Sequence, residues 1–273
     1  MHSTFWSLLR GAVFSRLILL LLVAIIGCGD EKESSALERV AAGSAYGGVA
    51  FINAYSSICS GVFLKHGLVA TAAHCFVLAG MTEEQAANGL TLHFSFSGRV
   101  DGTDDLVLNA TSVAFDGPNT DLAYIQYDAA QTASRGELTA PEIHRETVKA
   151  GATLALAGYP IPGGGMYPPP LSSGWDRIET RNCTATGEVG RVAGYNGDLH
   201  GTDCIAWFGN SGGPVYLIAE QGVRRILGLV SHTFAPGATA TTVTPTGSDQ
   251  FGEYVPANFT PFARSDLLDS LIQ

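Results

Sequence analysis

Apolar residues fall along the chain in short runs, separated by Gly, Asn, Asp and Pro. The runs are rich in Val, Ile, Phe, Tyr and Thr, a composition that favours β-strands over helices. Their close spacing favours a barrel or a sandwich over alternating strand–helix units. The sequence predicts strands at residues 49–54, 61–64, 90–96, 106–115, 122–127, 153–157, 214–218 and 225–230.

Helical patterns are scarce. We expect a short helix at residues 82–87 and a terminal helix at residues 265–272, with Ser265 or Asp266 capping its start. Residues 159–173 contain GGG and PPP triplets, which exclude regular structure over their length. We interpret them as an exposed loop, which either separates two halves of the fold or borders a binding cleft.

The N-terminus has the pattern of an export signal. Arg10 and Arg16 precede the apolar run 17–26, and polar residues follow it. We therefore assign residues 1–27 to a secretory signal peptide. The run is short for a membrane span, although counting from Ala12 would lengthen it, so a retained anchor helix is the alternative.

The end of this signal, IIGC at residues 25–28, resembles the lipobox of bacterial lipoproteins. The resemblance implies a lipid on Cys28, and an incidental buried cysteine is the plainer interpretation. Residues 28–46 would then carry the lipid site and a polar tether. We expect a protein exported and lipid-anchored to a bacterial membrane, with a secreted or periplasmic protein as the alternative.

Residues 47–273 form the remaining domain, which we expect to fold as one unit and as a monomer. Hydrophobic residues make up 46% of the chain, enough for a real core. The formal charge is −10, and no basic run interleaves with aromatic residues, so nucleic acid is a poor partner. Without Cys28 four cysteines remain, and in an oxidising compartment they allow three pairings.

Three motifs carry candidate chemistry. Residues 71–75 read TAAHC after an apolar run, residues 119–123 read NTDLA at the start of a strand, and residues 209–214 read GNSGGP before another strand. Any one of them alone is weak, because a single histidine is usually structural and Gly, Ser and Asp are common in turns. Their joint order is more informative.

Asp121 follows His74 by 47 residues, and Ser211 follows Asp121 by 90. In motif, order and spacing the chain resembles the chymotrypsin-like serine peptidases, over about residues 47–273. The resemblance implies an all-β fold of two packed six-stranded antiparallel barrels with a short C-terminal helix. It also implies hydrolysis of peptide bonds in protein or peptide substrates, without a cofactor.

The chemistry explains these residue types. A serine hydroxyl is a poor nucleophile until a base removes its proton, so Ser211 would attack and His74 would be the base. The resemblance assigns Asp121 to orienting His74, and Ser231 to supporting Asp121. The glycines around Ser211 permit a sharp turn that aims the N–H groups of Gly209 and Ser211 at the developing oxyanion.

The resemblance also implies a disulfide between Cys59 and Cys75, which leaves Cys183 and Cys204 to pair. The string GYP at residues 158–160 is similar to the bacterial glutamyl-endopeptidase branch. Digestive members of the family have an aspartate before the serine that pairs with a new N-terminal amine, whereas this chain has Asn210. We therefore expect activity without proteolytic trimming of the N-terminus. Activation by cleavage after Arg39 is the alternative.

Substrate preference follows from the positions that would line the pocket. Ile205 stands where trypsin-like members have an acid, and with Ala206 and Thr233 it predicts a small or apolar pocket. His232 could instead attract a carboxylate. We expect neutral side chains to be preferred over Lys or Arg.

Two other functions are compatible with a serine-containing motif of this kind. A binding or regulatory protein on an inactive protease scaffold is the main alternative, since a fold can be retained after its catalytic activity is lost. An esterase of the α/β-hydrolase type is disfavoured, because those enzymes order their triad Ser, Asp, His. The histidines and cysteines lack the close spacing of metal ligands, so no metal site is expected.

Overall fold

The structure is a computed structural model, and it describes residues 37–39, 48–54, 57–103, 106–117, 120–161, 170–190, 198–219, 222–231, 247–249 and 252–273. The expected signal peptide at residues 1–27, the lipid site Cys28 and the pocket residues His232 and Thr233 lie outside the described residues. So does most of the expected loop at residues 159–173.

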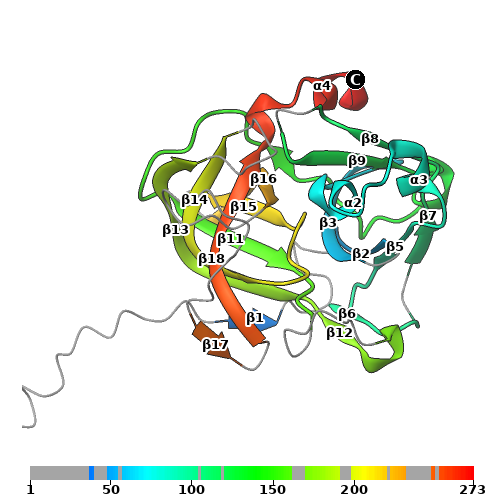
Figure 1. Ribbon diagram of the computed structural model, residues 1–273, viewed down its shortest axis with the longest axis horizontal. Helices are drawn as coiled ribbons and strands as arrows, with labels where there is room; N and C mark the ends of the chain where they lie inside the picture. Colours follow the sequence, from blue (N-terminus) through cyan, green and yellow to red (C-terminus); the bar gives the residue numbers. More distant parts are fainter. Residues whose placement is uncertain are drawn as a thin grey trace, which may run out of the picture. The chain divides into compact units, whose positions relative to one another are not determined.

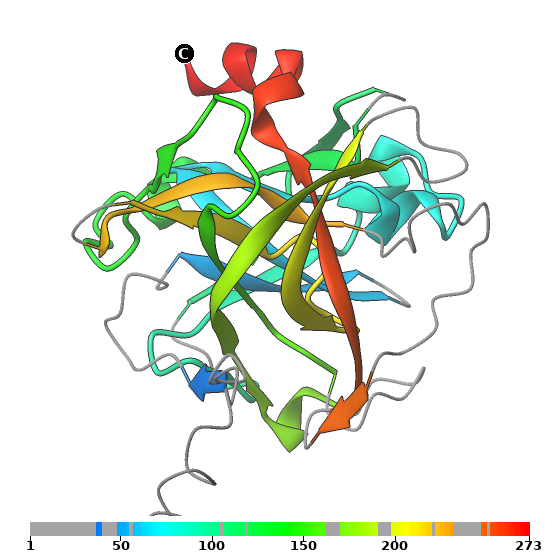
Figure 2. The ribbon, with the colours of Figure 1, turned by 90° about the vertical axis from the view of Figure 1, so that its left-hand side faces the viewer.

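The C-terminal half forms a closed antiparallel barrel (Figures 1 and 2). Neighbouring strands pair in the order β16, β15, β11, β13, β14 and β18, and pairing of β18 with β16 closes the ring. This is the six-stranded barrel that the resemblance implies. The strands are β11 (Thr153–Gly158), β13 (Ile178–Gly190), β14 (Leu199–Trp207), β15 (Pro214–Ile218), β16 (Arg224–Val230) and β18 (Gly252–Pro261).

Three short strands extend this sheet. β10 (Glu142–Ile143) pairs in parallel with β16, and β17 (Gly247–Asp249) pairs with β18. β1 (Leu37–Arg39) pairs with β13, although it falls within the stretch 28–46 that was expected to be a tether. Residues 37–39 of that stretch are therefore paired with the barrel.

The N-terminal half is a second curled antiparallel sheet, of seven strands among the described residues. The order is β7, β5, β2, β3, β4, β9 and β8, so the structure has one strand more here than the expected six. The expected strand at residues 106–115 is two strands. Their bounds are β2 (Val49–Ala54), β3 (Ser57–Lys65), β4 (Leu68–Ala72), β5 (Thr91–Phe94), β7 (Leu106–Asn109), β8 (Ser112–Phe115) and β9 (Leu122–Gln126).

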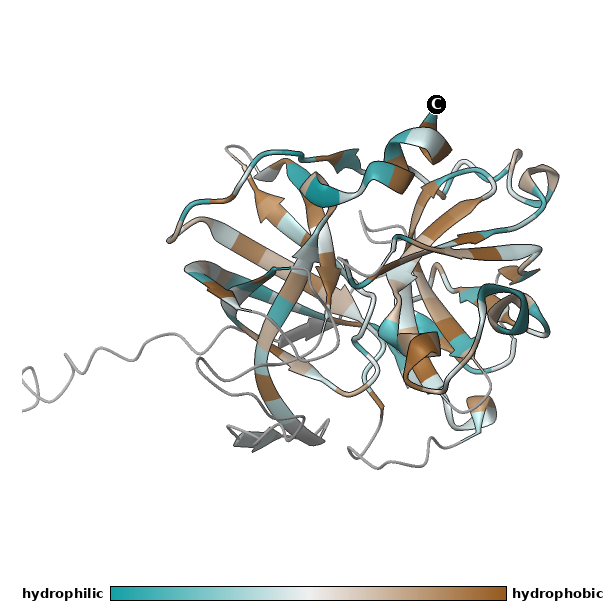
Figure 3. Cartoon of the chain, turned by 45° about the horizontal axis from the view of Figure 1, so that its top comes forward, coloured by the Kyte–Doolittle hydropathy of each residue, from teal (hydrophilic) through white to brown (hydrophobic). Residues whose placement is uncertain are grey.

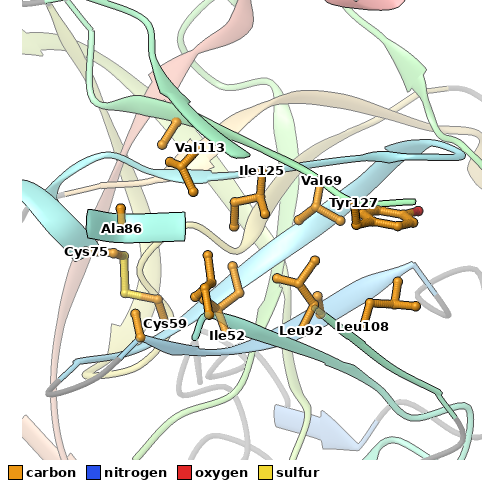
Figure 4. Close-up of a cluster of buried hydrophobic side chains, with 14 of the residues drawn as sticks. Ile52, Cys59, Val69, Cys75, Ala86, Leu92, Leu108, Val113, Ile125 and Tyr127 are labelled. Atoms are coloured by element: carbon orange, nitrogen blue, oxygen red, sulfur yellow. A yellow bond between two sulfur atoms is a disulfide. The ribbon is translucent and has the colours of Figure 1, made fainter. Parts of the chain in front are cut away.

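Each barrel encloses its own apolar core, and a third core lies between them. Figure 4 shows the N-terminal core, in which Ile52, Val69 and Ile125 pack together beside the Cys59–Cys75 disulfide. The hydropathy colours of Figure 3 show the apolar residues concentrated on the strands, which explains the short apolar runs of the sequence.

The shared core joins the halves through aromatic side chains. Phe51 of β2 packs edge-on against Trp175 and Tyr159 of the C-terminal half, with ring centroids 5.1 and 5.7 Å apart. The short strand β12 (Trp175–Asp176) also pairs with β6 (Arg99–Val100). The two barrels are therefore packed as one body, with their contact surface buried.

The helices are few and short, as predicted. α3 (Glu83–Ala87) begins with a capping box between Thr82 and Gln85, and α4 (Asp266–Ile272) begins at the cap Ser265. α2 (His74–Val77) was not predicted, because four residues are too few for a periodic pattern. The described residues also include 3₁₀ turns at Ala129–Gln131, Leu171–Ser173 and Phe262–Arg264. No helix in the described ranges has the length and apolar content to cross a membrane.

α4 follows the C-terminal barrel in sequence but packs on the N-terminal one (Figure 1). Ser265 Oγ lies 2.5 Å from the hydroxyl of Tyr124 in β9, and the N–H of Leu267 donates to Asp116 Oδ1 at 3.1 Å. Asp116 begins the loop that leads to Asp121. The C-terminal helix therefore holds this loop from outside.

Replacing Leu268 with alanine should lower the free energy of unfolding by about 2 to 5 kcal/mol, because this side chain of α4 is fully buried. Chemical denaturation monitored by fluorescence measures the change. The matched control is Ile272→Ala on the same helix, where the side chain is 37% exposed and the expected loss is about 0.5 kcal/mol or less. Equal losses in the two variants would show that α4 does not pack as described.

Candidate functional site

His74 and Asp121 are in direct contact. His74 Nδ1 lies 2.6 Å from Asp121 Oδ2, and the backbone N–H of His74 donates to Oδ1 of the same carboxylate at 2.8 Å. Both residues are buried, with 7% and 2% of their surfaces exposed. Because one carboxylate binds both the ring and the backbone of His74, the ring orientation is fixed. The Nε2 edge of the imidazole lies on the side of the ring away from Asp121.

Ser231, at the end of β16, also contacts Asp121. Its hydroxyl donates to Asp121 Oδ2, as the resemblance implies for this residue. The preceding residue, Val230, accepts a hydrogen bond from the N–H of Gly212 at 2.7 Å and donates to the carbonyl of Gly213 at 2.8 Å. One strand end therefore positions both the aspartate and the turn that carries Ser211.

The Ser211 turn lies against the strand that precedes His74. A Cβ built on Gly212 would lie 2.2 Å from Thr71 Oγ1 and 2.7 Å from the backbone nitrogen of Ala72. Gly212 also has φ +79°, a conformation that residues with a side chain rarely adopt. Glycine at this position therefore lets the turn of one barrel approach β4 of the other, which brings Ser211 toward His74.

The two N–H groups expected to bind the oxyanion are available. Across the described part of the chain, the N–H groups of Gly209 and Ser211 donate no hydrogen bond, and the hydroxyl of Ser211 has no partner either. The carbonyl of Phe208 accepts from the N–H of Ile161 at 2.6 Å. Because the peptide unit is planar, this bond turns the N–H of Gly209 away from Ile161.

Both disulfides implied by the resemblance are present. Cys59 and Cys75 are joined, which fixes β3 to the residue after His74, and Cys183 and Cys204 join β13 to β14. The N–H of Ser60, next to Cys59, donates to the carbonyl of Ser211 at 2.7 Å. The chain segments around His74 and Ser211 are thus linked through β3.

The predicted pocket residues are separated by the structure. Ile205 is partly exposed, whereas Ala206 is 3% exposed and belongs to the core inside the C-terminal barrel. Consecutive residues of a strand face opposite sides, which accounts for the difference. Of the two, Ile205 is the one that remains accessible. The other two pocket candidates lie outside the described residues.

Asn210 is fully buried between the serine turn and the segment around Gly158. Within the described residues, neither Oδ1 nor Nδ2 of its amide has a hydrogen-bond partner. A buried amide without partners is costly by about 1 to 3 kcal/mol. This position therefore has unused hydrogen-bonding capacity next to Ser211.

Sequence reasoning missed several residues that shape the site. Thr71 donates its hydroxyl hydrogen to the carbonyl of Ser60 at 2.7 Å, and Ile161 orients the peptide before Gly209. Asp116 accepts hydrogen bonds from Thr120 at 3.2 Å and from Leu267, on either side of the loop to Asp121. Their roles depend on contacts between distant segments, for which the sequence contains no local signal.

Comparison with known proteins gives a consistent family match. A profile described as "Trypsin-like peptidase domain" matches residues 59–223, more than half of the chain. The matched range includes His74, Asp121 and Ser211. No curated protein sequence matches the chain significantly.

Solved structures show the same fold at low identity. A Glu endopeptidase in complex with MPD has a TM-score of 0.57 at 16% identity, covering 88% of this chain and 96% of that one. An HtrA-type protease, AlgW, with a tripeptide has a TM-score of 0.51 at 18% identity, covering 84% and 61%. The human heparin binding protein has a TM-score of 0.56 at 18% identity, covering 87% and 96%.

Replacing Gly212 with alanine should destabilise the protein by more than about 3 kcal/mol, because the new Cβ meets Thr71 and the backbone of Ser60 and Ala72. Thermal unfolding measures the effect. The control is Gly222→Ala, where φ is +76° but nothing lies within 4 Å of the added Cβ. This control should lose only about 1 to 2 kcal/mol of stability, the cost of placing a side chain at a positive φ. Similar losses in both variants would rule out the close approach at Gly212.

Proposed function

The chain belongs to the trypsin-like peptidase domain family, and we therefore propose that it is a serine endopeptidase that forms an acyl-enzyme on Ser211. One observation carries the proposal: His74 is held by Asp121, and the Ser211 turn and Asp121 are tied to the same end of β16. Membership of the family alone would indicate the fold, whereas these contacts around His74, Asp121 and Ser211 support the proposed catalytic chemistry.

The proposed reaction has two stages. Ser211 Oγ attacks the carbonyl carbon of the scissile bond while His74 takes its proton, and the tetrahedral intermediate then expels the amine, which receives that proton from His74. In the second stage a water molecule loses its proton to His74 and attacks the ester. Collapse of this second intermediate releases the acid and restores the proton to Ser211.

Asp121 keeps the proton on Nδ1 of His74, so that Nε2 can act as the base, and stabilises the imidazolium that forms. The oxyanion of each intermediate would accept from the N–H groups of Gly209 and Ser211. Donors of this kind contribute about 3 kcal/mol each to lowering the barrier. Since both N–H groups lack partners among the described residues, they need no rearrangement to act.

We propose that the enzyme prefers substrates with a neutral side chain on the residue before the scissile bond. Ile205, the accessible pocket candidate, offers no charge to Lys or Arg. The Glu endopeptidase among the solved structures is named for an acidic preference, which keeps a carboxylate as the competing ligand. Cleavage of a peptide library would decide between them.

The alternative function is a binding or regulatory protein on the same scaffold. Its support is that Ser211 Oγ makes no hydrogen bond to His74 in the described residues, and that one similar structure is named for heparin binding. Catalytic hydrogen bonds are often long in free enzymes and shorten when substrate binds, so we favour the peptidase.

A fluorophosphonate probe should label the wild-type protein covalently, and Ser211→Ala should abolish labelling and lower kcat by at least about 10⁴-fold, because only an activated serine reacts. Gel fluorescence and peptide hydrolysis measure these effects. The control Ser270→Ala removes an exposed hydroxyl of α4 and should change neither. Absence of labelling in folded wild-type protein would favour the binding protein.

We further propose that the protein is exported and held at a bacterial membrane by a lipid on Cys28, and that it is active without a trimmed N-terminus. The second proposal rests on Asn210, a neutral amide that cannot form an ion pair with a terminal amine.

Chains beginning at Gly29 and at Val40 should therefore have kcat/KM values within about threefold of each other, less than 1 kcal/mol in the barrier. Hydrolysis of one peptide substrate by both chains, titrated for active sites, measures the ratio. A large excess of activity in the chain that starts at Val40 would mean that the buried amide of Asn210 takes the amine as its partner.

A further inference from the structure

Ser60 is a fully buried serine of the N-terminal barrel that contacts the nucleophile turn of the other barrel. It lies in β3 directly after Cys59, whose disulfide leads to Cys75 and so to His74. Neither the proposed proton transfers nor the oxyanion donors use its hydroxyl. Its hydrogen bonds nevertheless converge on the residues that carry those donors.

The hydroxyl of Ser60 makes two hydrogen bonds, and both reach the C-terminal barrel. It donates to the carbonyl of Gly209 at 2.8 Å and accepts from the N–H of Tyr159 at 2.8 Å. A hydroxyl has one hydrogen to donate, so the two bonds define its role as donor to Gly209 and acceptor from Tyr159. The side chain thus connects the nucleophile turn to the segment beside it.

The backbone of Ser60 adds two further bonds. Its N–H donates to the carbonyl of Ser211, and its carbonyl accepts the hydroxyl hydrogen of Thr71, both at 2.7 Å. Gly209 and Ser211 are the two residues whose N–H groups are expected to bind the oxyanion. One residue of the opposite barrel therefore holds the carbonyls of both.

The peptide units around Gly209 are then fixed on either side. Ile161 holds the carbonyl of Phe208, and Ser60 holds the carbonyl of Gly209 itself. Gly209 has φ +96°, and a Cβ there would lie 2.4 Å from the carbonyl oxygen of Tyr159. The Gly209 N–H shares a planar peptide unit with the Phe208 carbonyl, and the bond from Ser60 fixes the next unit. Since a glycine has little intrinsic conformational preference, holding both units limits rotation of the backbone at Gly209.

The neighbouring glycines accommodate Ser60. A Cβ on Gly158 would lie 2.8 Å from Ser60 Oγ, and a Cβ on Gly212 would lie 2.3 Å from the Ser60 carbonyl oxygen. Two glycines of the C-terminal barrel thus leave the space that the serine occupies. The surroundings therefore fit a hydroxyl at this point.

We infer that Ser60 is a positioning residue that holds the backbone immediately after Gly209 and after Ser211, and so preorganises the turn that carries the oxyanion donors from the opposite barrel. The inference rests on the proposed peptidase function. Preorganised donors stabilise the transition state without reorganising during the reaction. Loss of the Ser60 hydroxyl should therefore weaken binding of the transition state more than binding of the substrate.

The experiment is steady-state hydrolysis of a peptide substrate by Ser60→Ala, at a temperature where the variant is fully folded by circular dichroism. We expect kcat to fall at least about tenfold while KM stays within about threefold. The inhibition constant of a peptide boronic acid should rise by about the factor by which kcat/KM falls, because the tetrahedral boronate places an oxygen where the oxyanion forms.

Ser265→Ala is the matched control. Ser265 is also a buried serine whose hydroxyl makes two hydrogen bonds, one with the hydroxyl of Tyr124 and one accepted from the N–H of Leu268, and it lies outside the site. It should lose stability but keep kcat. Wild-type kcat in Ser60→Ala, an effect confined to KM, or an equal fall of kcat in both variants would each overturn the inference.

Ser60→Thr keeps the hydroxyl and should retain kcat within about threefold of wild type, so it tests the inference if the alanine variant does not fold. A folded threonine variant that loses kcat as severely as the alanine variant would contradict the role of the hydroxyl. A wild-type protein that neither hydrolyses peptides nor reacts with a fluorophosphonate would contradict the peptidase proposal instead, whatever the Ser60 variants do.

Discussion

The structure depends most on one buried carboxylate. Asp121 is almost completely removed from solvent, and a buried charge is tolerated only when hydrogen bonds replace its hydration. The described donors include the ring and the backbone N–H of His74 and the hydroxyl of Ser231. His74 belongs to the N-terminal barrel, whereas Ser231 follows β16 of the C-terminal one. Docking of the barrels therefore contributes to satisfying the carboxylate.

Much of this arrangement was accessible from the sequence, and the reason lies in local patterns. Apolar runs predicted β2, β15 and the helix α4 with its cap, because alternation and capping are properties of neighbouring residues. The resemblance of three motifs gave both disulfides and the contact of Asp121 with His74 and Ser231. Those motifs are short, but their order along the chain restricts the possible folds strongly.

The remainder depends on contacts between distant segments. Residues 106–115 gave one apolar run yet form two strands, because β7 pairs with β5 at one end of the strand order and β8 pairs with β9 at the other. The sequence assigned no role to Ser60, because its four bonds to other segments have no counterpart in the local sequence. Ala206 was assigned to the pocket, but the phase of β14 turns its side chain into the barrel core.

The disulfide and Ser60 together have a consequence for how the protein loses its structure. His74, Cys75, Cys59, Ser60 and Ser211 form a continuous chain of covalent and hydrogen bonds from one barrel to the other. Separation of the barrels would break the bonds of Ser60 to Gly209 and Ser211 at once. The arrangement of His74 and Ser211 and the contact between the barrels should therefore be lost together, as one cooperative unit of unfolding.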